Sequence, residues 1–351
     1  MAEIEKIMNI ATGDIEKLMN IAVDDIEKVM GVEYPASATW TGTRGVLGGG
    51  YISGSESDVI DYKTISSTGA MSDFGDLSTG NYYFTACSNG TRGLFLGGYF
   101  STGGNVIFNK IEYITVGSTG DATDAGDLTQ AKLDVVSSSN GTRALVFAGV
   151  DGSGSWNELD EIDYVTIDST SNASDFGDVA TGAIESQGGA INDATYALRY
   201  QGTLGSTNWD VMVKYIDYVT MASTGNTSDF GDMTLSVISG LGGCSNTTRG
   251  VSWGGRISAS ADTDNIDYVT IASAGDATDF GDVTIQAQNN AASGNGAVSN
   301  LTKGECYGGY STGGSAHQNI AYITIASTGN ATSAGDDLSG ATYGHSSLSG
   351  T

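Results

Sequence analysis

The chain has 351 residues and a formal net charge of −27, with 41 acidic residues against 14 lysines and arginines. Binding to nucleic acid or to an anionic membrane needs clustered lysine and arginine, so this charge argues against both kinds of partner. There are 52 glycines and one proline, Pro35, and runs of Ser, Thr, Asn and Asp separate β-branched and aromatic segments. This composition is typical of an all-β protein with many turns.

The sequence shows neither a signal peptide nor a membrane span. The N-terminus is charged from Glu3, and no apolar run approaches about 20 residues. Cys87, Cys244 and Cys306 are odd in number and far apart, so they make neither a disulfide framework nor a metal knuckle. We therefore expect no membrane insertion and synthesis in a reducing cytoplasm.

Residues 1–34 carry a repeat of eleven residues, in which the triplet Ile-Glu-Lys begins at Ile4, Ile15 and Ile26. One long helix with a slight right-handed supercoil is one interpretation of this period. It would expose aliphatic residues such as Ile10 on the face opposite the apolar stripe. Aspartates at N-cap positions, and Asn or Gly where helices would end, favour three short helices joined by tight turns.

We predict that this helical array is an anchoring module. About three such units are near the minimum for a shared core, so the array needs the rest of the chain or a partner to be stable. The residues expected to anchor it to a partner are Ile4, Ile7, Met8, Ile15, Leu18, Met19, Ile26, Val29 and Met30. Pro35 marks the start of the β-rich region, which we place at residues 35–351.

A second repeat, of about fifty residues, fills this β-rich region. The hexapeptide IDYKTI at residue 60 returns in similar form at residues 111, 162, 216, 266 and 320, at spacings of 51, 51, 54, 50 and 54. A glycine-flanked strand such as RGLFLGG or RGVSWGG precedes each copy, and turns like STGNTSDFGD, with a short edge strand near FGDL, follow it. One unit thus contains four strands, the size of one propeller blade, and the repeat predicts an all-β, six-bladed β-propeller.

The end of the chain favours a closed ring over an open solenoid, which is the alternative. Residues 339–351 parallel residues 78–91, which begin a unit, so they are expected to supply the missing first strand of blade one. Closure would also remove exposed sheet edges. Residues 37–40 are the other candidate for this strand, and in that case the array and the variable loops would share one end of the ring.

The repeats also carry a resemblance. The Gly-Gly pair that ends the second strand resembles kelch-type β-propellers, although the later Tyr and Trp pattern of that family is not followed. The degenerate IDYVTIASTGNATDFGD repeats resemble propeller proteins of tailed bacteriophages, especially marine ones, and the DIEKLMNIA array is similar to N-terminal repeats of phage virion proteins.

This resemblance implies a non-enzymatic virion structural protein, either a capsid decoration or a tail or fibre component in a multi-copy assembly. Other virion proteins would hold it through its N-terminal repeats, and the propeller would be displayed for attachment to the host. It would be made in the host cytoplasm and then reside in the virion. The alternative is a bacterial surface lectin or adhesin that binds glycans through its loops, which the lack of a signal peptide disfavours.

No catalytic constellation stands out, and we expect neither enzymatic activity nor a cofactor. His317 and His345 are the only histidines and lack metal-ligand spacing, which leaves little room for a copper site like that of kelch-type oxidases. A calcium ion in the Asp-rich turns stays open, because hard cations favour clustered oxygen ligands.

The repeated charges have a structural interpretation. We predict that Arg44, Arg92, Arg143 and Arg249 pair with carboxylates of the DFGD segments, namely Asp76, Asp178, Asp232 and Asp282, within or between blades. The alternative is a ring that binds an anion.

The loops between second and third strands vary in length and content, and they are the candidate ligand-binding elements. Aromatic faces beside Asp and Asn are typical of sugar-binding sites, although the aromatic residues could equally cover loop cores. The candidate residues are Phe100, Trp156, Trp209, Asp262 and His317.

Overall fold

The computed structural model describes residues 42–350 apart from 103, 153–156, 181–183, 186–188, 201–202, 205–212, 238, 259, 284–295, 312–314, 337 and 339. The chain divides into two units, Met1–Ser37 and Ala38–Thr351, and every described residue belongs to the second. The predicted helical array, with its anchoring residues from Ile4 to Met30, lies outside the described residues and stays a prediction. In the described part of the chain the elements are strands, and no helix there is long and apolar enough to cross a membrane.

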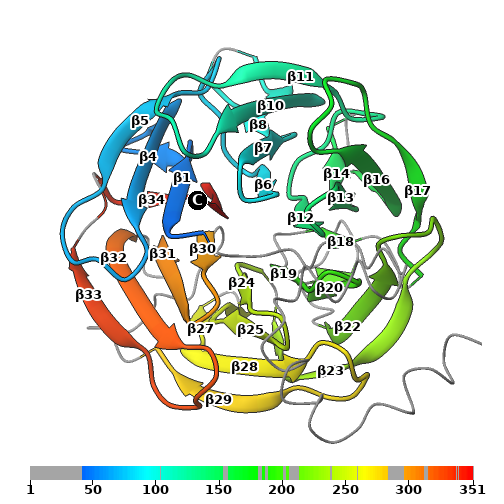
Figure 1. Cartoon of the computed structure of the whole chain (residues 1–351), viewed down its shortest axis with the longest axis vertical. Helices are drawn as coiled ribbons and strands as arrows, with labels where there is room; N and C mark the ends of the chain where they lie inside the picture. Colours follow the sequence, from blue (N-terminus) through cyan, green and yellow to red (C-terminus); the bar gives the residue numbers. More distant parts are fainter. Residues whose placement is uncertain are drawn as a thin grey trace, which may run out of the picture. The chain divides into compact units, whose positions relative to one another are not determined.

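The second unit is an all-β propeller, in which antiparallel sheets surround a central axis (Figure 1). Five of the sheets have four strands each. In order from the innermost strand to the outermost, the first is β35 (Ser346–Gly350), β1 (Arg44–Gly48), β4 (Val59–Thr64) and β5 (Ser72–Asp76), and the second is β6 (Thr85–Ser88), β7 (Arg92–Leu96), β10 (Lys110–Thr115) and β11 (Thr123–Asp127). The third is β12 (Val136–Ser139), β13 (Arg143–Phe147), β16 (Glu161–Thr166) and β17 (Ser174–Asp178), and the fourth is β19 (Gly189–Asn192), β20 (Tyr196–Tyr200), β22 (Val213–Thr220) and β23 (Ser228–Val237). The fifth is β24 (Gly242–Ser245), β25 (Arg249–Trp253), β28 (Asn265–Thr270) and β29 (Thr278–Asp282).

The last repeat belongs to a larger sheet of seven strands. This sheet contains β30 (Gly296–Ser299), β31 (Lys303–Ser311), β32 (Ser315–Thr324) and β33 (Thr332–Asp336), and continues through β34 (Thr342–Tyr343) into β2 (Tyr51–Ile52) and β3 (Ser55–Glu56). The prediction of six separate four-stranded blades is therefore wrong as stated, because the described residues form five such blades and one merged sheet. The merger arises because β32 is long enough for His317 to pair with Thr342, and β34 in turn pairs with β2.

Within the described ranges, four two-stranded ladders extend from the ring. They are β8 (Tyr99–Phe100) with β9 (Val106–Ile107), β14 (Val150–Asp151) with β15 (Asn157–Glu158), β18 (Ile184–Glu185) with β21 (Thr203–Leu204), and β26 (Arg256–Ser258) with β27 (Ala261–Asp262).

The C-terminal strand closes the ring. β35 pairs with β1 in antiparallel register from Arg44↔Gly350 to Gly48↔Ser346, and it is the innermost strand of the first sheet. Of the two candidates for this strand, the structure thus has the C-terminal one. The first sheet therefore combines strands from both ends of the propeller sequence, and β1 has a hydrogen-bonded neighbour on its inner side.

Hydrophobic contacts between neighbouring sheets form the core. In one cluster, Val46 and Phe74 of the first sheet are buried together with Phe95 and Ile114 of the second. Because middle strands are covered by a sheet on each side, they are apolar almost without interruption, as in the buried run of β13. The ring is thus held by a chain of sheet-to-sheet interfaces.

The glycine of the DFGD segment lets the outer strands meet the next sheet. Gly75 has φ +149°, and a Cβ there would lie 2.5 Å from the carbonyl carbon of Gly120, in the STG turn of the second sheet. Gly120 N donates to Phe74 O at 2.7 Å, so this turn covers the outer strand of the preceding sheet. The same arrangement recurs where Gly231 lies against Gly275. The repeat therefore protects its own outer edge by covering it.

The acidic residue of the IDYVTI repeat also joins neighbouring sheets. Glu112, Asp163 and Asp267 are almost completely buried. Each accepts a hydrogen bond from the chain that leaves the preceding sheet: from Ser78 N at 2.9 Å, from Thr129 Oγ1 at 2.5 Å and from Thr234 N at 3.0 Å, respectively. The repeated carboxylate is thus structural at these positions, because a buried charge needs such partners.

Candidate binding surfaces of the propeller

The two ends of the ring differ in kind. One end, which we call the constant end, carries the NGT turns before the second strands and the STG turns after the third strands. The other end, which we call the variable end, carries the Gly-Gly segments and the loops that contain the extra hairpins. Because β1 begins at Arg44, the chain enters the first sheet from the constant end.

The predicted pairing of arginines with DFGD carboxylates is wrong, and strand register gives the reason. Arg44 lies opposite Thr64, whereas Asp76 lies opposite Val59, at the other end of the same strand β4. The DFGD segment is itself the outermost strand rather than a turn, so its last aspartate reaches the variable end. The same register separates Arg92, Arg143 and Arg249 from the ends of their outer strands.

All four arginines instead stack on tyrosines, and Arg44, Arg143 and Arg249 also donate to carbonyl groups of the next sheet. The guanidinium of Arg44 lies 4.4 Å from the ring centroid of Tyr62, and its Nη1 donates to Val116 O at 2.7 Å. Arg249 does the same with Tyr268 and with Ile325 O, at 4.2 and 2.9 Å. Arg92 and Arg143 stack on Tyr113 and Tyr164, at 3.7 and 4.9 Å. These cations therefore act as struts between sheets.

The aspartates that end the outer strands make contacts of their own. The backbone N–H of Asp76, Asp178, Asp232 and Asp282 each donates to an Asp or Asn side chain in the STG turn of the next sheet, at 3.0–3.1 Å. The Asp232 carboxylate pairs with Lys214 at 2.9 Å. Desolvation and the nearby carboxylates of Asp58 and Asp121 raise the pKa of Asp76.

The predicted ligand-loop residues are dispersed, with one exception. Phe100 is half-buried in β8, and Trp156 and Trp209 lie outside the described residues. Asp262 in β27 and His317 in β32 come near each other across two sheets. Burial lowers the pKa of His317, and the negative charge of Asp262 opposes this effect.

A cluster of tyrosines at the variable end escaped the sequence analysis. Tyr51 lies 5.4 Å from both Tyr82 and Tyr343, measured between ring centroids. Tyr82 lies 4.4 Å from Tyr83, and the remaining pairs are Tyr82 with Tyr99 at 5.4 Å and Tyr310 with Tyr343 at 4.6 Å. The members come from loops far apart in sequence, so no local pattern gathers them; the adjacent tyrosines at 82 and 83 were the one visible signal. We call these six residues the tyrosine cluster.

Glu56 fixes the loops beside this cluster. Its carboxylate accepts hydrogen bonds from the backbone N–H of Ser101 at 2.9 Å and from Thr102 Oγ1 at 2.5 Å, which tie β3 to the loop after β8. Desolvation raises the pKa of Glu56, but the hydrogen bonds from Ser101 and Thr102 outweigh it and lower the pKa to about 2. Glu56 is therefore ionised at neutral pH and engaged in holding two loops together.

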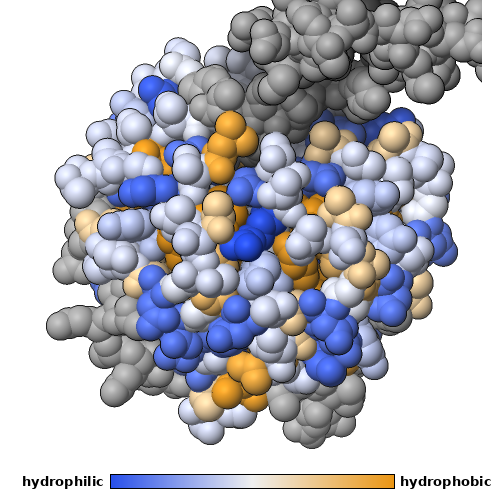
Figure 2. Space-filling model, turned by 60° about the horizontal axis from the view of Figure 1, so that its bottom comes forward, coloured by the Kyte–Doolittle hydropathy of each residue, from blue (hydrophilic) through white to orange (hydrophobic). Residues whose placement is uncertain are grey.

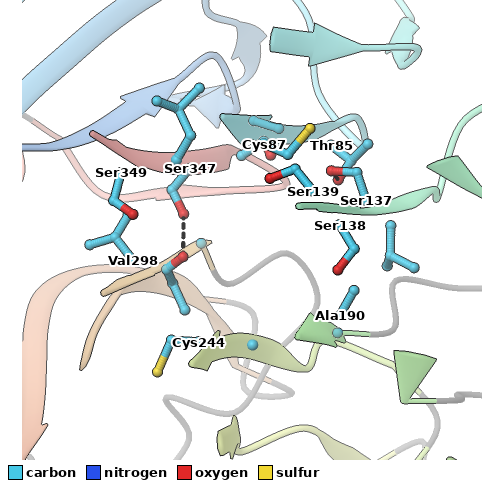
Figure 3. A pocket seen from close by; sticks show the side chains of 18 of the residues that line it. Thr85, Cys87, Ser137, Ser138, Ser139, Ala190, Cys244, Val298, Ser347 and Ser349 are labelled. Carbon is cyan, nitrogen blue, oxygen red and sulfur yellow. Dashed lines mark hydrogen bonds between the residues drawn. The ribbon is translucent and has the colours of Figure 1, made fainter. Parts of the chain in front are cut away.

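The innermost strands enclose a central channel with a cavity of about 130 Å³ (Figure 3). At the constant end a belt of side chains links one sheet to the next: Ser139 Oγ donates to Ser88 O at 2.6 Å, and Ser299 Oγ to Ser245 O at 2.7 Å. Further links run from Ser245 to Asn192, from Asn192 to Ser139 and from Ser88 to Ser349. We call Ser88, Ser139, Asn192, Ser245, Ser299 and Ser349 the serine belt.

Small side chains also line the rest of the channel. In five inner strands the second residue is more exposed than its neighbours, as in the patterns of β6 and β12, whereas β35 is buried along its whole length. Of these positions, Ser137 and Ser347 carry hydroxyls, and both point from their strands toward the pocket in Figure 3. Tyr83 and His345 line the cavity at the variable end, so the channel leads from the tyrosine cluster toward the serine belt.

The three cysteines lie on strands and are buried and free. Burial raises the pKa of each thiol to about 12. Among the described residues no three His, Cys, Asp or Glu side chains converge as metal ligands do. On the face seen in Figure 2, hydrophobic residues form small separate groups among hydrophilic ones.

Comparison with models of known protein families finds no match to this chain, and comparison with curated proteins finds none. The propeller fold is therefore established by the strand arrangement itself.

Proposed function

We propose that this chain is a non-enzymatic structural protein of a tailed-phage virion, whose propeller is displayed for binding to the host or another surface. Under this proposal, residues 1–34 attach it to other virion proteins, and many copies decorate the capsid or form part of a tail or fibre. The sequence resemblance of both repeats supports this assignment.

The observation that carries the proposal is the difference between the two ends of the ring. The constant end repeats the same turns and arginine struts, whereas the variable end bears hairpins of different length, the tyrosine cluster and the channel mouth. Loops on a rigid scaffold are where binding residues concentrate, because they change without disturbing the core.

We further propose that the repeat unit is kelch-like and that the merged seven-stranded sheet contains the sixth copy of it. The β30, β31, β32 and β33 meander repeats the strand order of the five separate blades, although its sheet extends further. The serine belt supports this description, since its members occupy equivalent positions in six inner strands. The Gly-Gly ends of the second strands support the kelch-like part.

Co-sedimentation with phage particles tests the proposal. The full-length protein should migrate with intact virions, and a variant that lacks residues 1–31 should not. A matched variant with Ile15, Leu18 and Met19 replaced by serine would test the apolar anchoring positions within an intact chain. If neither association nor its dependence on these residues is observed, the virion assignment fails and a bacterial adhesin becomes the better proposal.

A further inference from the structure

The central channel has the character of a ligand site for an uncharged molecule. Its lining consists of serines, small aliphatic residues and a few larger neutral ones, and the described lining contains no Asp, Glu, Lys or Arg. A cavity of about 130 Å³ is large enough to hold several water molecules. An ion would lose its hydration there without gaining an opposite charge, which makes a charged occupant unfavourable.

A buried polar atom in the lining calls for a polar occupant. His345 is 4 % exposed and lines the cavity, yet its Nδ1 makes no hydrogen bond. Its Nε2 is engaged, at 3.0 Å from Gly296 N and 3.1 Å from Tyr307 O. Serine hydroxyls nearby can accept as well as donate: Ser347 Oγ donates to Ala297 O at 3.1 Å and keeps acceptor capacity. Such a mixture of donors and acceptors suits a ligand rich in hydroxyl groups.

The mouth of the channel adds an aromatic surface. Tyr83 is only partly buried and stacks on Tyr82, so it connects the cavity with the tyrosine cluster. Tyr83 has φ +58°, and the corresponding left-handed positions before other inner strands are filled by Asp134, Gly240 and Gly344. A tyrosine at such a position is disfavoured by the backbone, so the side chain itself must be what the position requires.

We propose that the channel binds a terminal residue of a neutral saccharide, which enters past Tyr83 and hydrogen-bonds with the hydroxyls of Ser137 and Ser347. The sugar ring packs on the tyrosine face with its apolar side, and its hydroxyls replace water in the lumen. This inference rests on the surface-binding part of the proposed function and not on attachment to a virion.

The experiment uses the full chain and a set of related sugars. Saturation-transfer NMR and calorimetry compare methyl glucoside with its charged analogues, glucuronate and glucosamine, and methyl galactoside and N-acetylglucosamine extend the neutral set. We expect at least one neutral sugar to bind with a Kd of about 10 mM or tighter and the charged analogues to bind at least about tenfold more weakly.

Two variants address the site and one serves as a control. Ala86→Leu fills the lumen, and Tyr83→Gly removes the ring while it relaxes the left-handed backbone. Each should weaken the binding of the neutral sugar by about tenfold or more. Ser66→Gly relaxes a similar left-handed residue, with φ +77°, at the constant end and should leave binding unchanged. Thermal melts show which variants remain folded, and Tyr83→Gly keeps the test valid if Ala86→Leu does not fold.

The proposal is overturned if no neutral sugar binds in this range, if the charged analogues bind as well, or if folded Ala86→Leu and Tyr83→Gly retain full affinity. Its failure is distinguishable from failure of the virion assignment. Sugar binding without co-sedimentation would support the channel site and refute the virion assignment. Co-sedimentation without sugar binding would support the virion assignment and refute the channel site.

Discussion

His345 makes the closure of the ring sensitive to acid. The side chain is buried beside β35, and its Nε2 lies within hydrogen-bond distance of both Gly296 N and Tyr307 O. Burial lowers its pKa from 6.5 to about 4, although the Tyr307 carbonyl favours the protonated form. A proton on Nε2 would also turn the acceptor for Gly296 N–H into a donor.

The sign and size of the effect follow from linkage. Above about pH 6.5 the imidazole is neutral in the folded and unfolded states and contributes no pH dependence. Between pH 6.5 and pH 4 the unfolded state binds the proton and the folded state does not, so the stability falls as the pH falls. The shift of about 2.5 units corresponds to a loss of about 3 kcal/mol, which is complete once the pH is below about 4.

Urea unfolding between pH 4 and pH 7.5, followed by the fluorescence of buried Trp253, measures this loss. The test variant is His345→Leu, because leucine is the residue at the corresponding place before β24, Leu241. Between pH 7.5 and pH 4 we expect its free energy of unfolding to fall by about 3 kcal/mol less than that of the original protein. His317→Gln controls for the other histidine, which is only half-buried. An identical pH dependence in His345→Leu and the original protein would refute the assignment.

Three further outcomes are expected. Gly75→Ala should destabilise the propeller by about 1–3 kcal/mol in denaturant unfolding, because the new Cβ meets the turn of the next sheet. Gly120 is also left-handed but has nothing within 4 Å of a Cβ, so Gly120→Ala should lower the free energy of unfolding less. Equal losses of stability in the two variants would contradict the contact. Lys132→Met should cost about 3–5 kcal/mol, because it leaves the carboxylate of Asp163, 2.9 Å away, buried without its cation; a neutral result would show that the pair is not needed. The cysteine thiols should react with iodoacetamide at neutral pH only after unfolding, which mass spectrometry of labelled protein detects, and rapid labelling of the native protein would contradict their burial.

The sequence was most informative where it repeats. The IDYVTI segments are the third strands β4, β10, β16, β22, β28 and β32, because alternation and β-branched residues mark strands reliably at fixed spacing. The similarity of residues 339–351 to the start of a unit predicted the pairing of β35 with β1. The edge strand near FGDL was predicted as well, but its contacts were not: the glycine of DFGD admits the neighbouring turn, and the aspartates lie away from the arginines.

The candidate binding surfaces were only partly predictable. The loops between second and third strands were predicted as binding elements because they break the repeat, and this role stays a prediction. The tyrosine cluster depends on five separate segments of the chain meeting in space, and the channel lining depends on which residue of each inner strand faces the axis. Neither can be derived from one loop alone. The merged seven-stranded sheet has the same origin, because its link from β32 through β34 to β2 joins opposite ends of the sequence.

The pairing of β35 with β1 sets the order in which the molecule can be completed during synthesis. β1 emerges from the ribosome before any other described strand, and β35 emerges after all of them. Until then β1 lacks its inner neighbour, and the first sheet presents an open edge to other nascent chains. A chain that terminates before β35 therefore leaves the inner edge of β1 unpaired, whereas a chain translated through residue 350 pairs it.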